Sequence, residues 1–423
     1  MFETTIDKEK PPFLPPWKTI EINPRFSGQW IVAGDLDGDG NHEIVSVRNE
    51  EQAVATVIAY KLDGTELWRW GKKNAGKFYQ HHDVPLQLYD LDGDGKMEVV
   101  LSIKGEVLVL EGATGKEIQR YPLPKDLTVA DCITFANFSG KQRPCDIIVK
   151  SRYKKIWAFT SEWEQLWEWP PEGQHLSGFL STCHHPEPFD LDGDGKDELL
   201  SSSIMLDHDG TELWHINSDN MSIRGHLDCM RIARTGKRPE DFLLAISYCG
   251  ADCLGLVDGT GEVSWEKTGH HFESIDIGTL SASGEVGIYV DIDHLPRGES
   301  VGHLYNLDGD LLGKYHFYYG RHHRMLDWTE NGVSEIVLGN AATIVDVEGN
   351  QVAILDLGKK ARHIQSGKKR GDAEPFVSIH DFTNNGRADI ALHTSDKVYI
   401  YKNPSPSLGK RAKFIDDVNF TFY

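Results

Sequence analysis

The sequence predicts an all-β protein that forms a single β-propeller of four-stranded antiparallel blades. Three observations support this prediction. An acidic loop phrase recurs along the chain, a glycine-turn phrase recurs between its copies, and the copies are about 40 to 55 residues apart, which is the length of one blade. The 41 glycines and the scarcity of helix-periodic segments agree with short strands joined by tight turns.

Three copies of the acidic phrase are complete: the motif DLDGDG, with an apolar strand before it and another after it, begins at Asp35, Asp90 and Asp190. We call these the sharp loops. Two weaker copies read LDWTENGVSEIVLG and HDFTNNGRADIALH, and three more are eroded. In chain order the eight copies begin at Asp35, Asp90, Asn137, Asp190, Arg231, Asp276, Asp327 and Asp381. Eight blades are therefore expected, with seven as the alternative if an eroded copy is miscounted.

The second phrase, as in KLDGTELWRW and DHDGTELWHI, places an Asp-Gly turn between short apolar strands, which is a hairpin signal because such turns need positive φ. One unit then reads as four antiparallel strands. We expect one domain over residues 1–423, with a Pro-rich lead-in at 1–17 and the strand KTIEI at 18–22 completing the last blade. Two unrelated β-sandwiches are the alternative, but a sandwich has no reason to repeat one phrase at blade spacing.

The three sharp loops predict calcium sites. Each places carboxylates at relative positions 1, 3, 5 and 9, and glycines allow the turn that points them at one centre, where a hard cation finds several oxygens. The expected ligands are Asp35, Asp37, Asp39, Glu43, Asp90, Asp92, Asp94, Glu98, Asp190, Asp192, Asp194 and Glu198. The weaker copies carry Asp327, Thr329, Asn331, Glu335 and Asp381, Thr383, Asn385, Asp389, and they read as vacant, self-satisfied turns. We expect Ca²⁺ to stabilise the blades rather than to act in catalysis.

The composition argues against some classes of binding partner and bears on where the protein is found. A net charge of −21, from 65 acidic and 44 basic residues, argues against a nucleic-acid or membrane partner. No apolar stretch approaches the roughly 18 to 20 residues of a membrane span, and the start lacks a signal-peptide core. Six scattered cysteines form no zinc-type pair, and spacing leaves open whether Cys132 and Cys145 are bonded. We expect a cytoplasmic monomer; a secreted protein whose signal has been removed is the alternative.

Histidines are expected to gather at one end of the ring. In antiparallel blades, the links between blades and the turns between second and third strands share one end, opposite the acidic loops. The links carry His81, His82, His184, His185, Arg224, His226, His270, His271, Arg321, His322, His323 and Arg324, and the turns carry Lys104, Arg152, Tyr153 and Tyr248. This predicts a positive, titratable funnel for an anionic ligand. Structural hydrogen bonding by each histidine, or a transition-metal site, remains open.

The DLDGDGKxE phrase, the upstream histidines and the LDGTELW turns resemble those of the β-propeller polysaccharide lyases, namely the rhamnogalacturonan, ulvan and rhamnose–glucuronate lyases. The resemblance in architecture extends over nearly the whole chain, but only the DxDGDG motif is sharp, and non-catalytic propellers of the integrin type share it.

The resemblance implies β-elimination next to a uronic acid. A base removes the C5 proton, a cation neutralises the carboxylate, and an acid assists the leaving oxygen. It implies His81 or His82 as the base, with His82 preferred, Tyr153 as its acid/base partner, and Arg152 or Arg224 as the neutralising cation, with His185 as a further candidate. Such lyases often have a second histidine where this chain has Ser102-Ile103-Lys104, so either Lys104 supplies the charge or the site is reorganised.

The expected function is therefore a lyase acting on a rhamnose- and uronate-containing glycan. The expected substrate-binding residues are Lys104, His184, His226, Tyr248, His271, Arg321 and His322. A non-catalytic propeller that binds an acidic glycan or a protein is the main alternative, because a fold alone does not determine function. A metal-dependent hydrolase using the histidines is the third.

Overall fold

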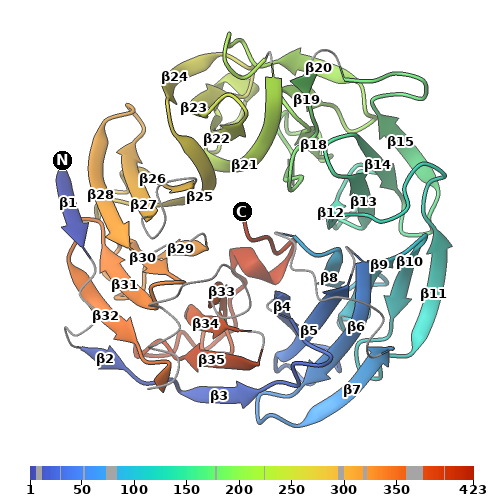
Figure 1. Cartoon of the computed structure of the whole chain (residues 1–423), viewed down its shortest axis with the longest axis vertical. Coiled ribbons are helices and arrows are strands. Elements are labelled where there is room, and N and C mark those ends of the chain that lie inside the picture. Colours follow the sequence, from blue (N-terminus) through green and yellow to red (C-terminus); the bar gives the residue numbers. More distant parts are fainter. Residues whose placement is uncertain are drawn as a thin grey trace.

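Eight antiparallel sheets are arranged in a closed ring around a central axis (Figure 1). The computed structural model describes residues 1–5, 12–28, 30–50, 53–72, 83–176, 179–222, 224–293, 300–317, 322–358, 375–394 and 396–423, and the side chains of all of these except residues 5, 179, 293 and 300. Each sheet has four antiparallel strands in which the innermost strand faces the axis. The prediction of an eight-bladed β-propeller is confirmed.

The first four blades follow one another along the chain. Blade 1 contains β4 (Trp30–Gly34), β5 (Glu43–Glu50), β6 (Ala53–Tyr60) and β7 (Glu66–Gly71). Blade 2 contains β8 (Leu86–Tyr89), β9 (Glu98–Ile103), β10 (Glu106–Leu110) and β11 (Glu117–Pro122). Blade 3 contains β12 (Ile133–Ala136), β13 (Asp146–Ser151), β14 (Lys155–Phe159) and β15 (Gln165–Trp169). Blade 4 contains β17 (Pro188–Phe189), β18 (Glu198–Leu200), β19 (Ile204–Leu206) and β20 (Glu212–His215).

The other four blades complete the ring. Blade 5 contains β21 (Arg224–Arg234), β22 (Leu243–Cys249), β23 (Cys253–Asp258) and β24 (Val263–Thr268), with β16 (Phe179–Leu180) parallel to β21. Blade 6 contains β25 (His271–Thr279), β26 (Val286–Asp293), β27 (Ser300–Asn306) and β28 (Leu311–Phe317). Blade 7 contains β29 (His323–Leu326), β30 (Glu335–Leu338), β31 (Thr343–Asp346) and β32 (Gln351–Leu355). Blade 8 contains β33 (Phe376–His380), β34 (Asp389–His393), β35 (Lys397–Tyr401) and β3 (Lys18–Glu21), and two 3₁₀ turns are η1 (Pro239–Asp241) and η3 (Ile415–Asp417).

The N-terminal segment closes the ring. As expected, the strand that begins at Lys18 pairs antiparallel with β35 and forms the outer strand of the last blade. The lead-in contributes more than the sequence predicted, because β1 (Phe2–Thr5) and β2 (Phe13–Leu14) pair parallel with the outer strands β28 and β32. No helix within the described residues has the length and apolar character that a membrane span requires.

The repeated LDGTELW phrase has a packing cause. The Trp68 indole N–H donates to the carbonyl of Gly112, 2.7 Å away in the next blade, and its ring lies over the turn there. A Cβ at Gly115, whose φ is +68°, would lie 2.4 Å from that ring. Trp167 and Trp265 make the same bond to His208 and Leu307 of their next blades. The turn of one blade is therefore small so that the tryptophan of the preceding blade can cover it.

The end of the sequence returns to the axis and fills it, which the sequence did not predict. Figure 1 shows the C-terminus at the centre of the ring, and Phe420 and Phe422 are buried there. Phe422 stacks on Phe376 with ring centroids 4.1 Å apart, and both tail rings meet Trp30 edge-on. Asp416 accepts three hydrogen bonds of 2.9 to 3.0 Å from the Arg324 guanidinium.

Residues 416–423 contact every blade. The partners are Trp30, Gln87, Phe135, His184, Arg231, Ser274, Arg324 and Ile379, from the inner strands of seven blades and the link into blade 4. Because the tail occupies the axis, the ring is not an open channel at this depth. A ligand on the histidine-bearing end therefore meets a floor made by the tail.

Candidate functional site

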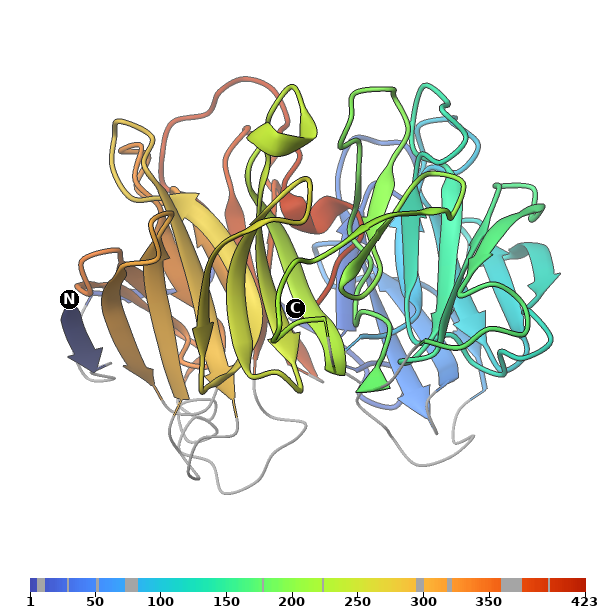
Figure 2. The same cartoon turned by 90° about the horizontal axis from the view of Figure 1, so that it is seen from above.

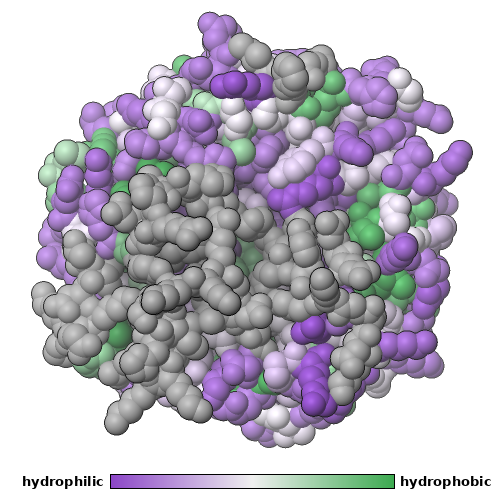
Figure 3. Space-filling model, viewed as in Figure 1, coloured by the Kyte–Doolittle hydropathy of each residue, from purple (hydrophilic) through white to green (hydrophobic). Residues whose placement is uncertain are grey.

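The two ends of the ring carry different side chains. Antiparallel pairing places the links into the inner strands, and the turns between second and third strands, at one end, which we call the histidine face; the acidic loops lie at the other end. Figure 2 shows the ring edge-on, with the two sets of loops above and below the strands. Figure 3 looks onto the histidine face, where hydrophilic side chains predominate among the described residues.

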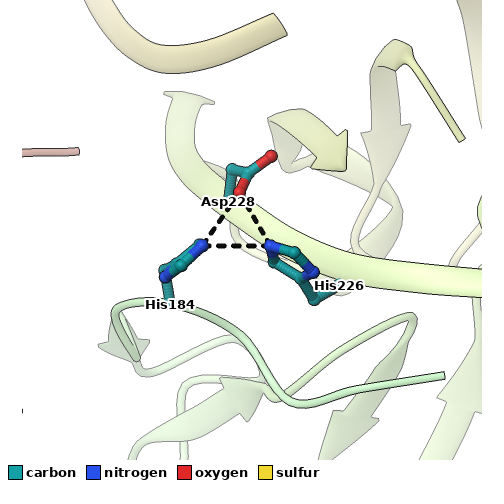
Figure 4. Close-up of side chains that lie close together, drawn as sticks. All are labelled: His184, His226 and Asp228. Carbon is teal, nitrogen blue, oxygen red and sulfur yellow. Dashed lines mark hydrogen bonds and ion pairs between the residues drawn. The ribbon is translucent and has the colours of Figure 1, made fainter. Parts of the chain in front are cut away.

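Two histidines and an aspartate meet at one point of this face (Figure 4). His184 comes from the link between β16 and β17, whereas His226 and Asp228 lie two residues apart on β21 and so point to the same side. The Nε2 atoms of His184 and His226 are 3.0 Å apart, and Asp228 Oδ1 lies 3.2 Å and 3.1 Å from them. His184 and Asp228 are only 6% and 1% exposed.

Burial controls the protonation of this group. Desolvation, followed by the charges of Arg152, Lys150 and His271, lowers the pKa of His226 to about 3. The imidazole is therefore neutral at physiological pH, with a lone pair available to a proton or to a metal ion.

Tyr153 covers the group from the turn between β13 and β14. Its hydroxyl lies 3.2 Å from His184 Nε2, and its ring centroid lies 4.4 Å from that of His226. The tyrosine has a φ of 68°, a left-handed conformation that costs energy for a bulky residue and that is often found at functional sites. Burial raises the pKa of Tyr153, and Arg152, whose Cζ lies 5.0 Å from the ring, opposes that shift. Tyr153 therefore keeps its proton and can donate it.

A second histidine group lies beside the first. His271 Nε2 is 2.9 Å from Glu273 Oε1 and 3.7 Å from the Cys249 sulfur, while its Nδ1 is 3.3 Å from Asp252. Contacts with Cys249 and Glu273 raise the pKa of His271 to about 11. This histidine is charged at neutral pH, unlike His226, so the two groups supply a cation and a neutral imidazole side by side.

Two further residues border the site. Arg224 begins β21 two residues before His226, is exposed, and forms no ion pair with any residue that the structure describes. Tyr423 from the tail stacks on His184, with centroids 4.5 Å apart and planes 15° apart. The site thus has a free guanidinium at its edge and an aromatic ring at its base.

The structure brings together some of the predicted site residues and separates others. Tyr153, Arg152, His184 and His226 converge, His271 lies next to them, and Arg224 begins the strand that carries His226. His81, His82 and Arg321 lie outside the described residues, so they have no position here. The remaining predicted residues, Lys104, His185, Tyr248 and His322, lie elsewhere.

Three of these four residues, His185, Tyr248 and His322, have buried side chains that contact other parts of the protein. His185 Nδ1 lies 3.4 Å from Asp83 Oδ2, and both are buried. The expectation that Tyr248 faces a ligand needs correction, because it is 0% exposed and its hydroxyl lies 3.1 Å from Ser202 Oγ. His322 is buried against the tail with Nδ1 3.0 Å from the Phe422 carbonyl oxygen. Lys104 is exposed on blade 2.

Sequence reasoning missed Asp228, Cys249, Glu273 and Tyr423. The signal for Asp228 was present, since a His-x-Asp pattern on an expected strand puts both side chains on one face. Cys249 and Glu273 gave no such signal, because they reach His271 from neighbouring strands. Tyr423 could not be placed without knowing that the tail returns to the axis.

Two kinds of group could hold a cation. The ligand atoms of His184, His226 and Asp228 all lie within 4.8 Å of one another, and two imidazoles with a carboxylate suit a transition metal. In the acidic loops, the side-chain oxygens of Asp35, Asp37 and Asp39 converge within the same limit, as do those of Asp90, Asp92 and Glu98. The donor sets therefore fit a hard cation in the loops and a softer one at the histidine face.

Comparison with known proteins gives a consistent family likeness. Residues 23–117, less than a quarter of the chain, match the model described as rhamnogalacturonan lyase family 11, C-terminal domain. The rhamnogalacturonan endolyase YesW of Bacillus subtilis (strain 168) is 29% identical over 354 residues, covering 68% of this chain and 54% of that protein. The rhamnogalacturonan exolyase YesX of the same organism is 27% identical over 312 residues, covering 57% and 48%. The chain thus spans about half the length of the curated relatives it matches.

A solved structure shares the fold. The rhamnogalacturonan lyase PL11 of Bacillus licheniformis superposes with a TM-score of 0.64 at 20% identity, covering 92% of this chain and 74% of that one. At this identity the likeness shows the fold alone. The chain is therefore an eight-bladed propeller whose residues 23–117 are similar to the C-terminal domain of rhamnogalacturonan lyase family 11.

Proposed function

We propose that this protein is a polysaccharide lyase that cleaves a rhamnogalacturonan-type glycan next to a uronic acid by β-elimination. The observation that carries the proposal is a partly buried, neutral His226 beside a protonated Tyr153, with the Arg152 guanidinium next to the tyrosine ring and Arg224 two residues before His226 on β21. The names of the relatives, rhamnogalacturonan endolyase and exolyase, support the same class of substrate.

The reaction first needs positive charge. The C5 proton of a uronate is weakly acidic, because removing it places a second negative charge next to the carboxylate. Arg152 and Arg224 approach the site from the β13–β14 turn and from β21, and either guanidinium can hold a carboxylate by two parallel hydrogen bonds. His271 is also charged, but Glu273, 2.9 Å away, balances that charge, so the two arginines are the cations that can meet a carboxylate. These groups stabilise the enolate-like charge as it forms.

The reaction then needs a proton acceptor and a proton donor. Neutral His226 can take the C5 proton, and the Asp228 carboxylate 3.1 Å from its Nε2 stabilises the imidazolium that results. Tyr153, with its pKa raised by burial, donates to the oxygen at C4 as that bond breaks. The electron pair of the C5–H bond becomes the new C4–C5 double bond, and the C4–O bond pair leaves with the oxygen.

A divalent cation is the competing use of the same atoms. His184, His226 and Asp228 would hold it, and it would supply Lewis acidity to the uronate carboxylate. With both imidazoles as ligands, another base would be needed, and the sequence offers His82, which lies outside the described residues. Calcium in the acidic loops, in contrast, is proposed only to stabilise the blades. We further propose that the protein acts as a monomer on its acidic glycan.

The test is the ultraviolet absorbance of the unsaturated product formed from rhamnogalacturonan. His226→Ala should lower kcat by about 10² to 10⁴-fold, the usual contribution of a general base, and Tyr153→Phe by about 10²-fold. His215→Ala is the matched control, because His215 is exposed on blade 4 and should change nothing. If activity survives phenanthroline, which prefers transition metals, His226 acts as the base. If phenanthroline abolishes activity, His226 is a ligand of a catalytic cation instead.

No unsaturated product from any uronate glycan, together with measurable glycan binding, would contradict the lyase and support the non-catalytic propeller instead. New reducing ends without unsaturation would support the hydrolase.

A further inference from the structure

A groove between blades 1 and 2 lies apart from the histidine cluster, which is on blades 3 to 5. Its volume is about 780 Å³. It starts at the histidine face, at the β5–β6 and β9–β10 turns, and runs outward between β7 and β11, which lie side by side in Figure 1. Its main lining side chains are Glu50, Trp70, Lys72, Ile103, Lys104 and Glu117. This is the size of a site for a small molecule or a short segment of glycan.

The charges in the groove are not balanced. Glu50 is paired with Arg48, whose Nε lies 2.8 Å from its Oε1. Glu117 accepts a hydrogen bond of 2.8 Å from Arg120 and one of 3.0 Å from the Trp70 indole N–H. Glu50 is therefore neutralised by Arg48, whereas Glu117 shares Arg120 with Glu106.

The two lysines of the groove differ from its carboxylates. Lys72 and Lys104 are exposed, and neither has an ion-pair partner among the residues that the structure describes. On a chain whose net charge is −21, two ammonium groups in one groove with no acidic partner among the described residues are a local exception. They favour a ligand that carries a negative charge.

Trp70 supplies an apolar contact. The indole is half-buried, and because its N–H is already donated to Glu117, its remaining contribution is the ring itself. A pyranose packs its C–H groups against such a ring. The groove thus combines an aromatic surface with two cations.

We infer that this groove is a subsite for a uronate residue of the glycan, distinct from the point of cleavage. The inference rests on the proposed function for its choice of glycan, and it assigns Lys104 to binding at a distance from the histidines. Binding energy from a remote sugar helps to fix the chain across the histidine face. A neutral sugar would use Trp70 but would bring no negative charge to the two lysines.

The experiment is calorimetry with tetragalacturonate, with maltotetraose as the neutral control of equal length. The wild-type protein should bind the acidic tetrasaccharide, and Lys72→Ala/Lys104→Ala should weaken that binding about tenfold or more, since each lost charge-assisted hydrogen bond has an appreciable effect. Lys116→Ala, an exposed lysine on the β10–β11 turn at the other end of blade 2, should leave it unchanged. Added salt should weaken wild-type binding more than that of the double variant.

Equal binding by the wild-type protein and the double variant would overturn the inference, as would equal affinity for maltotetraose or no binding at all. A His226→Ala variant separates this result from the proposed function. If it loses activity but keeps lysine-dependent binding, both statements hold. If no glycan yields an unsaturated product while binding still depends on the lysines, the subsite is supported and the lyase activity is contradicted. If product forms with the same KM in the double variant, the lyase activity is supported and the subsite is contradicted.

Discussion

The sharp and the weak acidic loops have the same backbone shape but satisfy their carboxylates differently. In the sharp loop of blade 4, Glu198 accepts the Leu191 N–H at 2.7 Å with one oxygen, while the other, Oε1, is buried without a hydrogen-bond partner among the described residues. In the weak loop of blade 7, the corresponding Glu335 accepts the Trp328 N–H at 2.7 Å, and the Thr329 hydroxyl donates to its second oxygen at 2.5 Å.

The weak loop of blade 8 repeats this arrangement. Asp389 accepts the Thr383 hydroxyl at 3.0 Å and the Asn403 N–H at 2.8 Å, so both of its oxygens are used. In the weak loops, the hydroxyl of the threonine at the third position thus satisfies the last carboxylate of the loop by a hydrogen bond, as a bound cation would in a sharp loop. We propose that the sharp loops bind calcium and that hydrogen bonds from the threonine hydroxyls take its place in the weak ones.

Removing calcium should have the largest effect. A loop that is occupied at a calcium concentration of a hundred times its Kd gains about 3 kcal/mol of folding free energy, so loss from all three sharp loops is a large fraction of the stability of a domain. Thermal unfolding with calcium and with EGTA measures this. Equal melting temperatures in the two conditions would show that the sharp loops are self-sufficient.

Converting one sharp loop to the weak pattern should have a smaller effect. The double substitution Asp192→Thr with Asp194→Asn gives the blade 4 loop the residue types of Thr329 and Asn331. The variant should bind one calcium ion fewer and should lose about 3 kcal/mol of calcium-dependent folding free energy. Without calcium, the variant should be as stable as the wild type or more so, because a hydroxyl replaces a repelling carboxylate. Calcium stoichiometry and melting temperatures report both, and the reverse pair Thr329→Asp with Asn331→Asp is the control that should gain a site.

The calcium-free protein should also become less stable as pH rises. Burial, with added repulsion from neighbouring aspartates, raises the pKa of Glu43 and Glu98 to about 7 and that of Glu198 to about 8. Since these carboxyls bind a proton more tightly when folded than when unfolded, the stability they contribute is present at low pH and is lost between about pH 5 and about pH 8. Melting temperatures in EGTA across this range should fall, and calcium should flatten the profile. A rise with pH in EGTA would contradict the account.

The smallest effect should come from a weak loop. Thr329→Val removes the hydroxyl that satisfies Glu335, which is 4% exposed, and should cost about 1 to 2 kcal/mol with or without calcium. Thr114→Val is the control, because Thr114 bonds to Glu111 on an exposed turn. Urea denaturation of the two variants resolves this difference, and a cost at Thr329 that depended on calcium would mean that the weak loop binds the ion.

The fold could be predicted because each blade repeats its own signals. The acidic phrase and the glycine turns are local signals, and the acidic phrase recurs eight times along the sequence, three of them in eroded form. The strand at Lys18 could be assigned to blade 8 because a closed ring needs a last partner. The tail could not be assigned, since Phe420 and Phe422 carry no repeat signal and reach the axis through tertiary packing.

The site could be predicted only in part. Topology placed His184, His226, Tyr153 and Arg152 at one end of the ring, and the structure brings them together. It could not distinguish His184 from its neighbour His185, which points to Asp83 instead, because adjacent link residues have no fixed direction in the sequence. It also could not show that Tyr248 is buried, since that depends on the packing of blade 5 against blade 4.

The most direct test of the central claim compares two products of one digestion. Wild-type protein is incubated with rhamnogalacturonan, and new double bonds, measured by ultraviolet absorbance, are counted against new reducing ends. The account predicts that the two rise in equal number and that both are lost in His226→Ala. Reducing ends without double bonds, or the absence of both, would contradict it.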